Sequence, residues 1–216
     1  MGDLNRTVVG WGWVDAIYRR RAQDILRKSL IHRHLPRHGL LLDIGSGLGH
    51  LAEAIVRDAP TRACVLVDPL AALSPRVTSR MKAFSLHAVR ASGTRLPFPH
   101  SQFDGGWAAF VLHHLPLDDQ RSVLGEVVRV LKPAAPFVLL EDTPASSSEL
   151  AITLRADRRL NFEDRDAPHH YRSPDEWRAT LPRHGLIVER EIPFQRVFPP
   201  ATLRAVQHRA FLCRHQ

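Results

Sequence analysis

Residues 40–51 constrain the fold of this chain more than any other stretch. They read Leu-Leu-Leu-Asp-Ile-Gly-Ser-Gly-Leu-Gly-His-Leu. The three leucines predict a buried parallel strand, and the apolar spacing that starts at Leu51 predicts a helix. Between them stand Gly45, Gly47 and Gly49, which permit positive φ and leave backbone N–H groups free to face a ligand. A strand, a glycine turn and a helix in this order predict a nucleotide-binding loop.

The spacing of the glycines indicates which kind of nucleotide binds. Dinucleotide folds use G-x-G-x-x-G, which brings a pyrophosphate to the helix N-terminus. Here the third glycine comes one residue early, and His50 stands at the place of the dinucleotide glycine. Asp43 precedes the turn, and a carboxylate there suits a cationic ligand without phosphates. The stretch resembles motif I of the class I methyltransferases that use S-adenosylmethionine.

A second acidic residue follows the next apolar run. Asp68 comes after Val67 and 19 positions past Gly49, at the predicted end of a strand over 63–67. A carboxylate at that end can accept hydrogen bonds from both ribose hydroxyls. The alternative is a turn-forming Asp before Pro69. Because a glycine loop precedes it, we expect Asp68 to bind ribose.

Three further motifs resemble the small-molecule methyltransferases of this family. They are Leu96-Pro97-Phe98 with Phe103-Asp104, the string VLHHL at 111–115, and RVLKP at 129–133. With the glycine loop and Asp68 they make five signals in the family's order, and the resemblance covers residues 40–141. The chain departs from the family at Ser92, where an Asp usually contacts adenine, and at Ala134 and Ala135, which replace glycines of a turn.

The resemblance implies an α/β fold, the Rossmann-like class I methyltransferase fold. Its sheet has seven strands, mostly parallel, flanked by helices, with the last strand antiparallel. The cofactor would be S-adenosyl-L-methionine and the product S-adenosyl-L-homocysteine. The residues expected to bind it are Tyr18, Arg21, Asp43, Gly45, Ser46, Gly47, Gly49, Asp68, Pro69, Leu70, Ser92, Gly93, Thr94 and Phe110.

We expect one domain over residues 1–216. It would comprise a helical lid (1–38), a cofactor-binding core (40–141), an insertion over the acceptor pocket (143–172), and a C-terminal helix with closing strands (173–216). Periodicity and punctuation predict helices over 11–34, 75–83, 119–131, 145–160 and from 173, and strands over 40–42, 63–67, 86–89, 105–110, 136–141, 186–192 and 206–212. The apolar face of the 145–160 helix would comprise Leu150, Leu154 and Leu160.

Composition limits the partners and the location. No apolar run approaches the roughly 20 residues of a membrane span, and residues 1–10 lack a signal-peptide core. Two distant cysteines, Cys64 and Cys213, imply neither a disulfide framework nor a zinc site, so a cytoplasmic location is expected. The net charge is +8, but only three of the 30 basic residues are lysines and the arginines are spread along the chain. Nucleic acid is therefore a less favoured partner.

Methyl transfer from a sulfonium is an in-line SN2 displacement, which requires above all that the reactants be aligned. A hydroxyl acceptor must also lose its proton, and histidine suits that task. The candidate bases are His114, His169 and His170, with Asp142 as an orienting partner or a carboxylate base; His113 is interpreted as structural. An acceptor carbon or nitrogen needs no dedicated base. The 13 histidines show no recurring ligand spacing, and Glu141 and Asp142 alternate along a strand, so no metal is predicted.

The sequence thus predicts a cytoplasmic S-adenosylmethionine-dependent methyltransferase acting on a small molecule, aromatic or lipid-like, as a monomer or homodimer. Two alternatives stay open. One is a methyltransferase of RNA or protein. The other is a non-catalytic cofactor-binding or partner protein with a methyltransferase fold.

Overall fold

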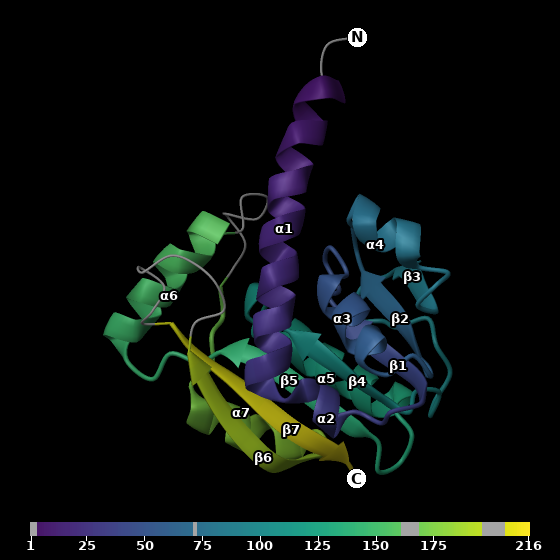
Figure 1. The fold of residues 1–216 in the computed structure, drawn as a ribbon. Helices are drawn as coiled ribbons and strands as arrows, with labels where there is room; N and C mark the ends of the chain where they lie inside the picture. The colour runs from purple at the N-terminus through teal and green to yellow at the C-terminus, as the bar shows by residue number, and fades with distance from the viewer. Residues whose placement is uncertain (1–3, 71–72, 161–168, 196–205) are drawn as a thin grey trace.

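A seven-stranded sheet forms the centre of the molecule. The computed structural model describes residues 4–70, 73–160, 169–195 and 206–216, and the side chains among them except those of 4–14 and 158–160. The strand order is β3-β2-β1-β4-β5-β7-β6 (Figure 1). Strands β1 to β5 pair in parallel, while β7 pairs antiparallel with β5 and β6. The fold class predicted from the sequence is confirmed.

The strands lie close to their predicted positions. Their bounds are β1 Gly39–Ile44, β2 Arg62–Asp68, β3 Leu86–Arg90, β4 Gly105–Ala109, β5 Pro136–Asp142, β6 Leu186–Gln195 and β7 Gln207–His215. The helices are α1 Leu4–Ser29, α2 Ile31–His34, α3 His50–Asp58, α4 Pro75–Arg80, the 3₁₀ turn η1 Leu112–His114, α5 Leu117–Val130, α6 Ser147–Leu160 and α7 Pro174–Arg183.

Each face of the sheet has its own hydrophobic core, because successive strand residues point to opposite faces. Leu42 and Ile44 of β1 join the core that contains α5 and α7 residues such as Val127 and Trp177. Leu41 joins the other core, which α1, α3 and α4 cover. Helices on both faces explain why these strands read as continuous apolar runs.

The strand order reverses between β1 and β4, and in open α/β sheets ligands bind outside the carboxyl ends of the strands at such a point. The chain leaves β1 at Ile44, and the N–H groups of Gly45 and Ser46 both donate to the Val67 carbonyl of β2, at 2.8 and 3.1 Å. The glycine loop is thus held at the carboxyl edge of the sheet, beside this reversal.

Two local expectations were wrong. The predicted 11–34 helix is interrupted at Leu30, which has a φ of 56° and separates α1 from α2. In α6 the buried face is formed by Thr153, Ala156 and Asp157, whereas Leu150 is 37% exposed. These buried residues are spaced i, i+3, i+4, but Thr153 is polar and Asp157 is charged, so a search for apolar periodicity misses the face.

The predicted start of the C-terminal helix is confirmed. Ser173 caps α7 as predicted, and it forms a full capping box with Glu176. Ala134 adopts a φ of 60° in the turn before β5, a conformation that glycine would adopt without strain. None of the helices in the described part of the chain combines the length and hydrophobicity that crossing a membrane requires.

Candidate active site

The glycine loop has the backbone that its sequence predicts. Gly45, Gly47 and Gly49 all have positive φ, of 69°, 48° and 77°. A Cβ at Gly45 would overlap the side chain of Val111, whereas a Cβ at Gly47 would meet nothing within 4 Å. Glycine is therefore required at Gly45 for conformation and for space, and Gly47 faces an open region where a ligand can approach.

Two carboxylates flank this loop. Asp43 is 2% exposed at the end of β1. Its burial, reinforced by the charge of Asp68, raises its pKa well above the ordinary value for an aspartate. Asp68 accepts hydrogen bonds from the N–H groups of Gly47 (3.0 Å) and Leu70 (2.9 Å). Burying Asp43 without a cation is costly, so a positively charged ligand would be stabilised beside it.

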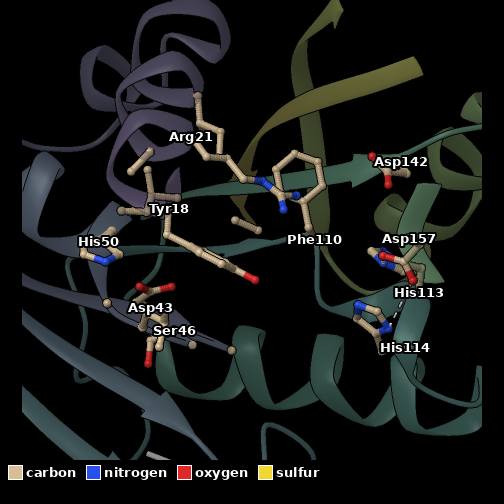
Figure 2. A pocket seen from close by; sticks show the side chains of 18 residues that line it. Tyr18, Arg21, Asp43, Ser46, His50, Phe110, His113, His114, Asp142 and Asp157 are labelled. Carbon is tan, nitrogen blue, oxygen red and sulfur yellow. Dashed lines mark ion pairs between the residues drawn. The ribbon is translucent and has the colours of Figure 1, made fainter. Parts of the chain in front are cut away.

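A cavity of about 240 Å³ extends from this loop. Tyr18 and Arg21 of α1 line it together with Phe110, and the Arg21 guanidinium lies 4.9 Å from the centre of the Phe110 ring (Figure 2). His50 Nε2 at the start of α3 lies 3.2 Å from Asp15 Oδ1 of α1, and burial lowers the pKa of His50 below its ordinary value. Figure 2 shows Asp43 and Ser46 on one side of the cavity and a group of histidines and aspartates on the other.

The far end of the cavity is a buried histidine–carboxylate cluster. His113 Nδ1 lies 2.5 Å from Glu141 Oε2, and both side chains are buried. His208 is hydrogen-bonded through Nδ1 to Asp142 Oδ1. Asp157 of α6 lies close to three histidine rings, at 3.9 Å from His113 Nε2, 4.0 Å from His114 Nδ1 and 3.2 Å from His169 Nδ1.

Burial and neighbouring charges shift the pKa values of the histidines and aspartates of this cluster in different directions. Burial, with the neighbouring His113 and His169, lowers the pKa of His114 to about 3, so its ring is neutral. Burial alone would lower the pKa of His113, but Glu141, Asp142 and Asp157 raise it above its ordinary value. Burial raises the pKa of Asp157, which makes it a stronger base than a solvated aspartate. Burial would also raise the pKa of Asp142, but His208 and other cationic groups lower it.

Most residues singled out from the sequence line the cavity: Tyr18, Arg21, Asp43, Gly45, Ser46, Gly47, Gly49, Phe110, His114 and Asp142. Others lie outside its lining. Asp68 ends β2 beside the glycine loop, and Pro69 and Leu70 follow it. Gly93 is close to Ile44 at the end of β1, and exposed Ser92 shares a hydrogen bond with Thr94.

The histidines 169 and 170 differ in position. His169 is buried next to Asp157, whereas His170 is anchored through its backbone, whose N–H donates to the His113 carbonyl at 2.7 Å. Neither lines the cavity.

Sequence reasoning missed Asp157, His50 and the cavity-facing position of His113. In the sequence, Asp157 is a charged residue one turn after Thr153 in a predicted helix. A charged residue in such a helix is normally interpreted as exposed to solvent. Its burial depends on how α6 packs, and a single sequence does not specify that packing.

Comparison with known proteins finds similarity to methyltransferases. Residues 42–139 match the methyltransferase domain family. The chain is 30% identical over 118 residues to the ubiquinone/menaquinone biosynthesis C-methyltransferase UbiE of Rickettsia bellii, covering 51% of this chain and 47% of that protein. The chain thus spans about half the length of the curated relatives it matches.

Solved structures extend the likeness to the whole fold. A putative methyltransferase from Bacillus halodurans aligns with a TM-score of 0.64 at 16% identity, over 89% of this chain and 97% of that one. The geranyl diphosphate C-methyltransferase of Streptomyces coelicolor, solved with Mg²⁺, geranyl diphosphate and S-adenosyl-L-homocysteine, aligns with a TM-score of 0.70 at 12% identity, over 89% and 79%. The resemblance stated from the sequence is confirmed, and the predicted enzyme class and cofactor agree with these matches.

Proposed function

We propose that this chain, which has the domain and the fold of the class I S-adenosylmethionine-dependent methyltransferases, transfers a methyl group from that cofactor to a small-molecule acceptor. The observation that carries the proposal is the two-sided cavity of Figure 2. One side is a glycine loop with a buried carboxylate, and the other is a cluster of proton-accepting side chains.

The cofactor would lie along the glycine loop. Its cationic methionine portion would pair with buried Asp43, and Tyr18 or Arg21 from the α1 lid would meet its carboxylate. Asp68 would accept the ribose hydroxyls, with Pro69 and Leu70 beside it. Ser92, Gly93 and Thr94 would border the adenine, and Ser92 can accept a hydrogen bond there only as a neutral group.

The acceptor would lie at the histidine end. When bound, the cofactor would supply a sulfonium methyl group for in-line displacement by the acceptor's nucleophilic atom, and the bond electrons would stay on sulfur as S-adenosyl-L-homocysteine forms. If that atom is a hydroxyl oxygen, its proton passes to Asp157, whose pKa is raised by burial, while neutral His114 orients the hydroxyl. Asp142 is less suited as the base because it is already paired with His208.

The acceptor class is supported by the relatives' names. UbiE is a C-methyltransferase of quinone biosynthesis, the Streptomyces neighbour acts on geranyl diphosphate, and a Burkholderia neighbour is an N-methyltransferase solved with 1,6-didemethyltoxoflavin. The two acceptors that these names give, geranyl diphosphate and 1,6-didemethyltoxoflavin, are small molecules, and the methylated atom differs among the three enzymes. We therefore propose an aromatic or lipid-like acceptor with one ionisable group. The cytoplasmic location and the monomeric or homodimeric state stay predictions for cell fractionation and size-exclusion chromatography.

Calorimetry with S-adenosyl-L-homocysteine, with NADH as the control ligand, tests the cofactor first. Micromolar binding of the former alone supports the proposal and justifies a screen of small hydroxylated acceptors with labelled cofactor. Absence of binding would favour the non-catalytic partner reading. A salt-dependent gel shift with RNA would favour the nucleic-acid alternative instead.

A further inference from the structure

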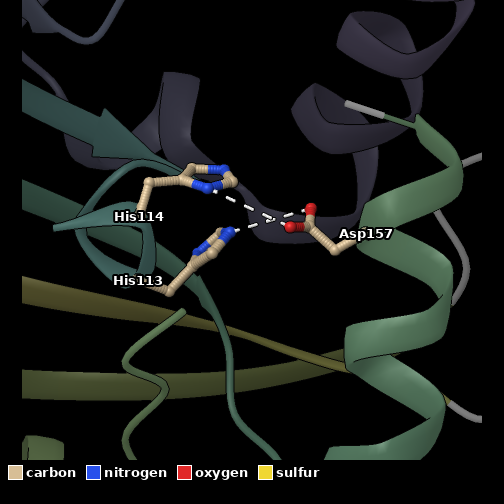
Figure 3. A group of neighbouring side chains, drawn as sticks. All are labelled: His113, His114 and Asp157. Atoms are coloured by element: carbon tan, nitrogen blue, oxygen red, sulfur yellow. Dashed lines mark ion pairs between the residues drawn. The ribbon is translucent and has the colours of Figure 1, made fainter. Parts of the chain in front are cut away.

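Three metal-ligand side chains converge at the histidine end of the cavity. His113 and His114 come from η1 and Asp157 comes from α6, and their ligand atoms all lie within 4.8 Å of one another (Figure 3). The pairs His113 Nε2–Asp157 Oδ1 and His114 Nδ1–Asp157 Oδ2 are 3.9 and 4.0 Å long. Two ligand atoms of a tetrahedral zinc ion lie roughly 3.3 Å apart, so each pair would have to shorten by about 0.7 Å.

His113 also has the outer partner that metal-bound histidines use. Its Nδ1 faces Glu141 at 2.5 Å, and Glu141 is itself fixed by the N–H groups of Val111 (3.1 Å) and Leu112 (2.7 Å). A carboxylate that accepts the proton of one ring nitrogen orients the ring and leaves the other nitrogen to bind a cation. In His113 that other nitrogen, Nε2, faces Asp157.

A fourth candidate ligand lies beside the three. His169 Nδ1 is 3.2 Å from Asp157 Oδ2, close to the separation found between ligands of one ion. In the part of the chain that the structure describes, His113 Nε2 and both ring nitrogens of His169 are buried without a hydrogen-bond partner. Buried polar atoms without partners call for an explanation, and an ion is one.

The charge of the region favours a cation. The carboxylates of Glu141, Asp142 and Asp157 are all buried within reach of His113. They are stabilised either by a proton on His113 or by a metal ion among the histidines.

We propose that His113, His114 and Asp157 bind one divalent transition-metal cation of the Zn²⁺ type, with His169 as a fourth ligand. Imidazole with one carboxylate suits Zn²⁺ or Fe²⁺ and their neighbours, and disfavours Mg²⁺ and Ca²⁺, which prefer oxygen ligands. All three residues line the cavity, so the acceptor would reach the ion from that side, either as a fifth ligand or in place of His169.

The ion would serve the proposed methyl transfer, and this part of the inference rests on that function. A bound Zn²⁺ lowers the pKa of a coordinated water or hydroxyl to near neutrality. An acceptor hydroxyl coordinated there would lose its proton to water, and Asp157 would then act as a ligand of the ion in place of the base role proposed for the metal-free site. The expectation of no metal came from spacing along the chain, whereas Asp157 lies 43 residues beyond His114 and meets it only in the fold.

The test is calorimetric titration of the metal-free protein with Zn²⁺ in the presence of a competing chelator, without any cofactor or acceptor. We expect a single Zn²⁺ per chain, and visible absorption bands typical of nitrogen- and oxygen-bound Co²⁺ after substitution with that ion. Asp157→Asn and His114→Gln should abolish this binding. Glu141→Gln, which keeps an acceptor for the Val111 and Leu112 N–H groups, should weaken it about tenfold or more.

His87→Gln is the matched control, because His87 is exposed on edge strand β3; binding should persist in that variant. Circular dichroism and S-adenosyl-L-homocysteine affinity of each variant separate loss of the metal from loss of the fold. If wild type binds no Zn²⁺, or if binding survives Asp157→Asn and His114→Gln, the metal site is refuted and the cluster is a proton-linked network. Because cofactor binding is measured independently, that outcome leaves the proposed function standing.

Discussion

The two ends of the cavity are built by different means. The glycine-loop end is made of main chain: three positive-φ glycines and the backbone N–H groups that Asp68 and Val67 fix. The histidine end is made of side chains from η1, β5, α6 and β7, which lie far apart in the sequence. The first end can be recognised from a dozen consecutive residues, whereas the second exists only when four elements pack together.

The largest effect on cofactor binding and stability is expected from adding a side chain to a glycine of the loop. Gly45→Val should abolish cofactor binding and destabilise the fold by about 2 kcal/mol or more, because it combines a strained φ with overlap against Val111. Gly47 also has a positive φ, but a Cβ added there would meet no other atom. Gly47→Ala should therefore lower the free energy of unfolding by only about 1 kcal/mol. Chemical denaturation of both variants compares them; equal losses would mean that space at Gly45 does not matter.

The side-chain end should control chemistry rather than cofactor affinity. Asp157→Asn removes the proposed base and should lower kcat about 100-fold or more while S-adenosyl-L-homocysteine affinity stays unchanged. Asp118→Asn on the exposed first turn of α5 is the control. Steady-state kinetics with calorimetry tests the split, and a parallel loss of cofactor affinity would show that the two ends are not separate.

Asp68 tests whether the loop end also makes a specific ligand contact. Asp68→Ala should weaken S-adenosyl-L-homocysteine binding about tenfold or more, through loss of charged hydrogen bonds to the ribose. Asp68→Asn keeps an acceptor for the Gly47 and Leu70 N–H groups and should lose less. Unchanged calorimetric affinity in the alanine variant would remove Asp68 from the ribose role.

The smallest effect concerns the stability of the protein without cofactor. The folded-state pKa of Asp43 is raised by burial, so its contribution makes stability fall as pH rises from about 4 through that folded pKa. Asp43→Asn should remove this loss and raise the thermal midpoint at about pH 8, by roughly 2–4 °C for each kcal/mol recovered. The same substitution should also lower the affinity of the protein for the cofactor. A thermal midpoint lower than that of wild type at about pH 4 and also at about pH 8 would contradict the idea that ligand binding, and not folding, needs this charge.

Regular elements were predictable where one local rule dominates. The strands, the glycine turn and the Ser173 cap follow from apolar runs, φ requirements and capping chemistry, all set within a few residues. The break at Leu30 and the buried face of α6 were not, because neighbouring elements decide which residues are covered.

By itself the sequence determined the glycine loop and the seven-stranded, mostly parallel sheet that the resemblance implies, and it singled out Asp43 and Gly45 to Gly49, which line the cavity. These depend on backbone conformation, which short motifs specify. Only the tertiary structure decided that Asp157 faces His113 and His114, and that Glu141 holds His113 in place. Buried charges are stabilised by partners in space, and periodicity along a chain does not encode which partners the fold will supply.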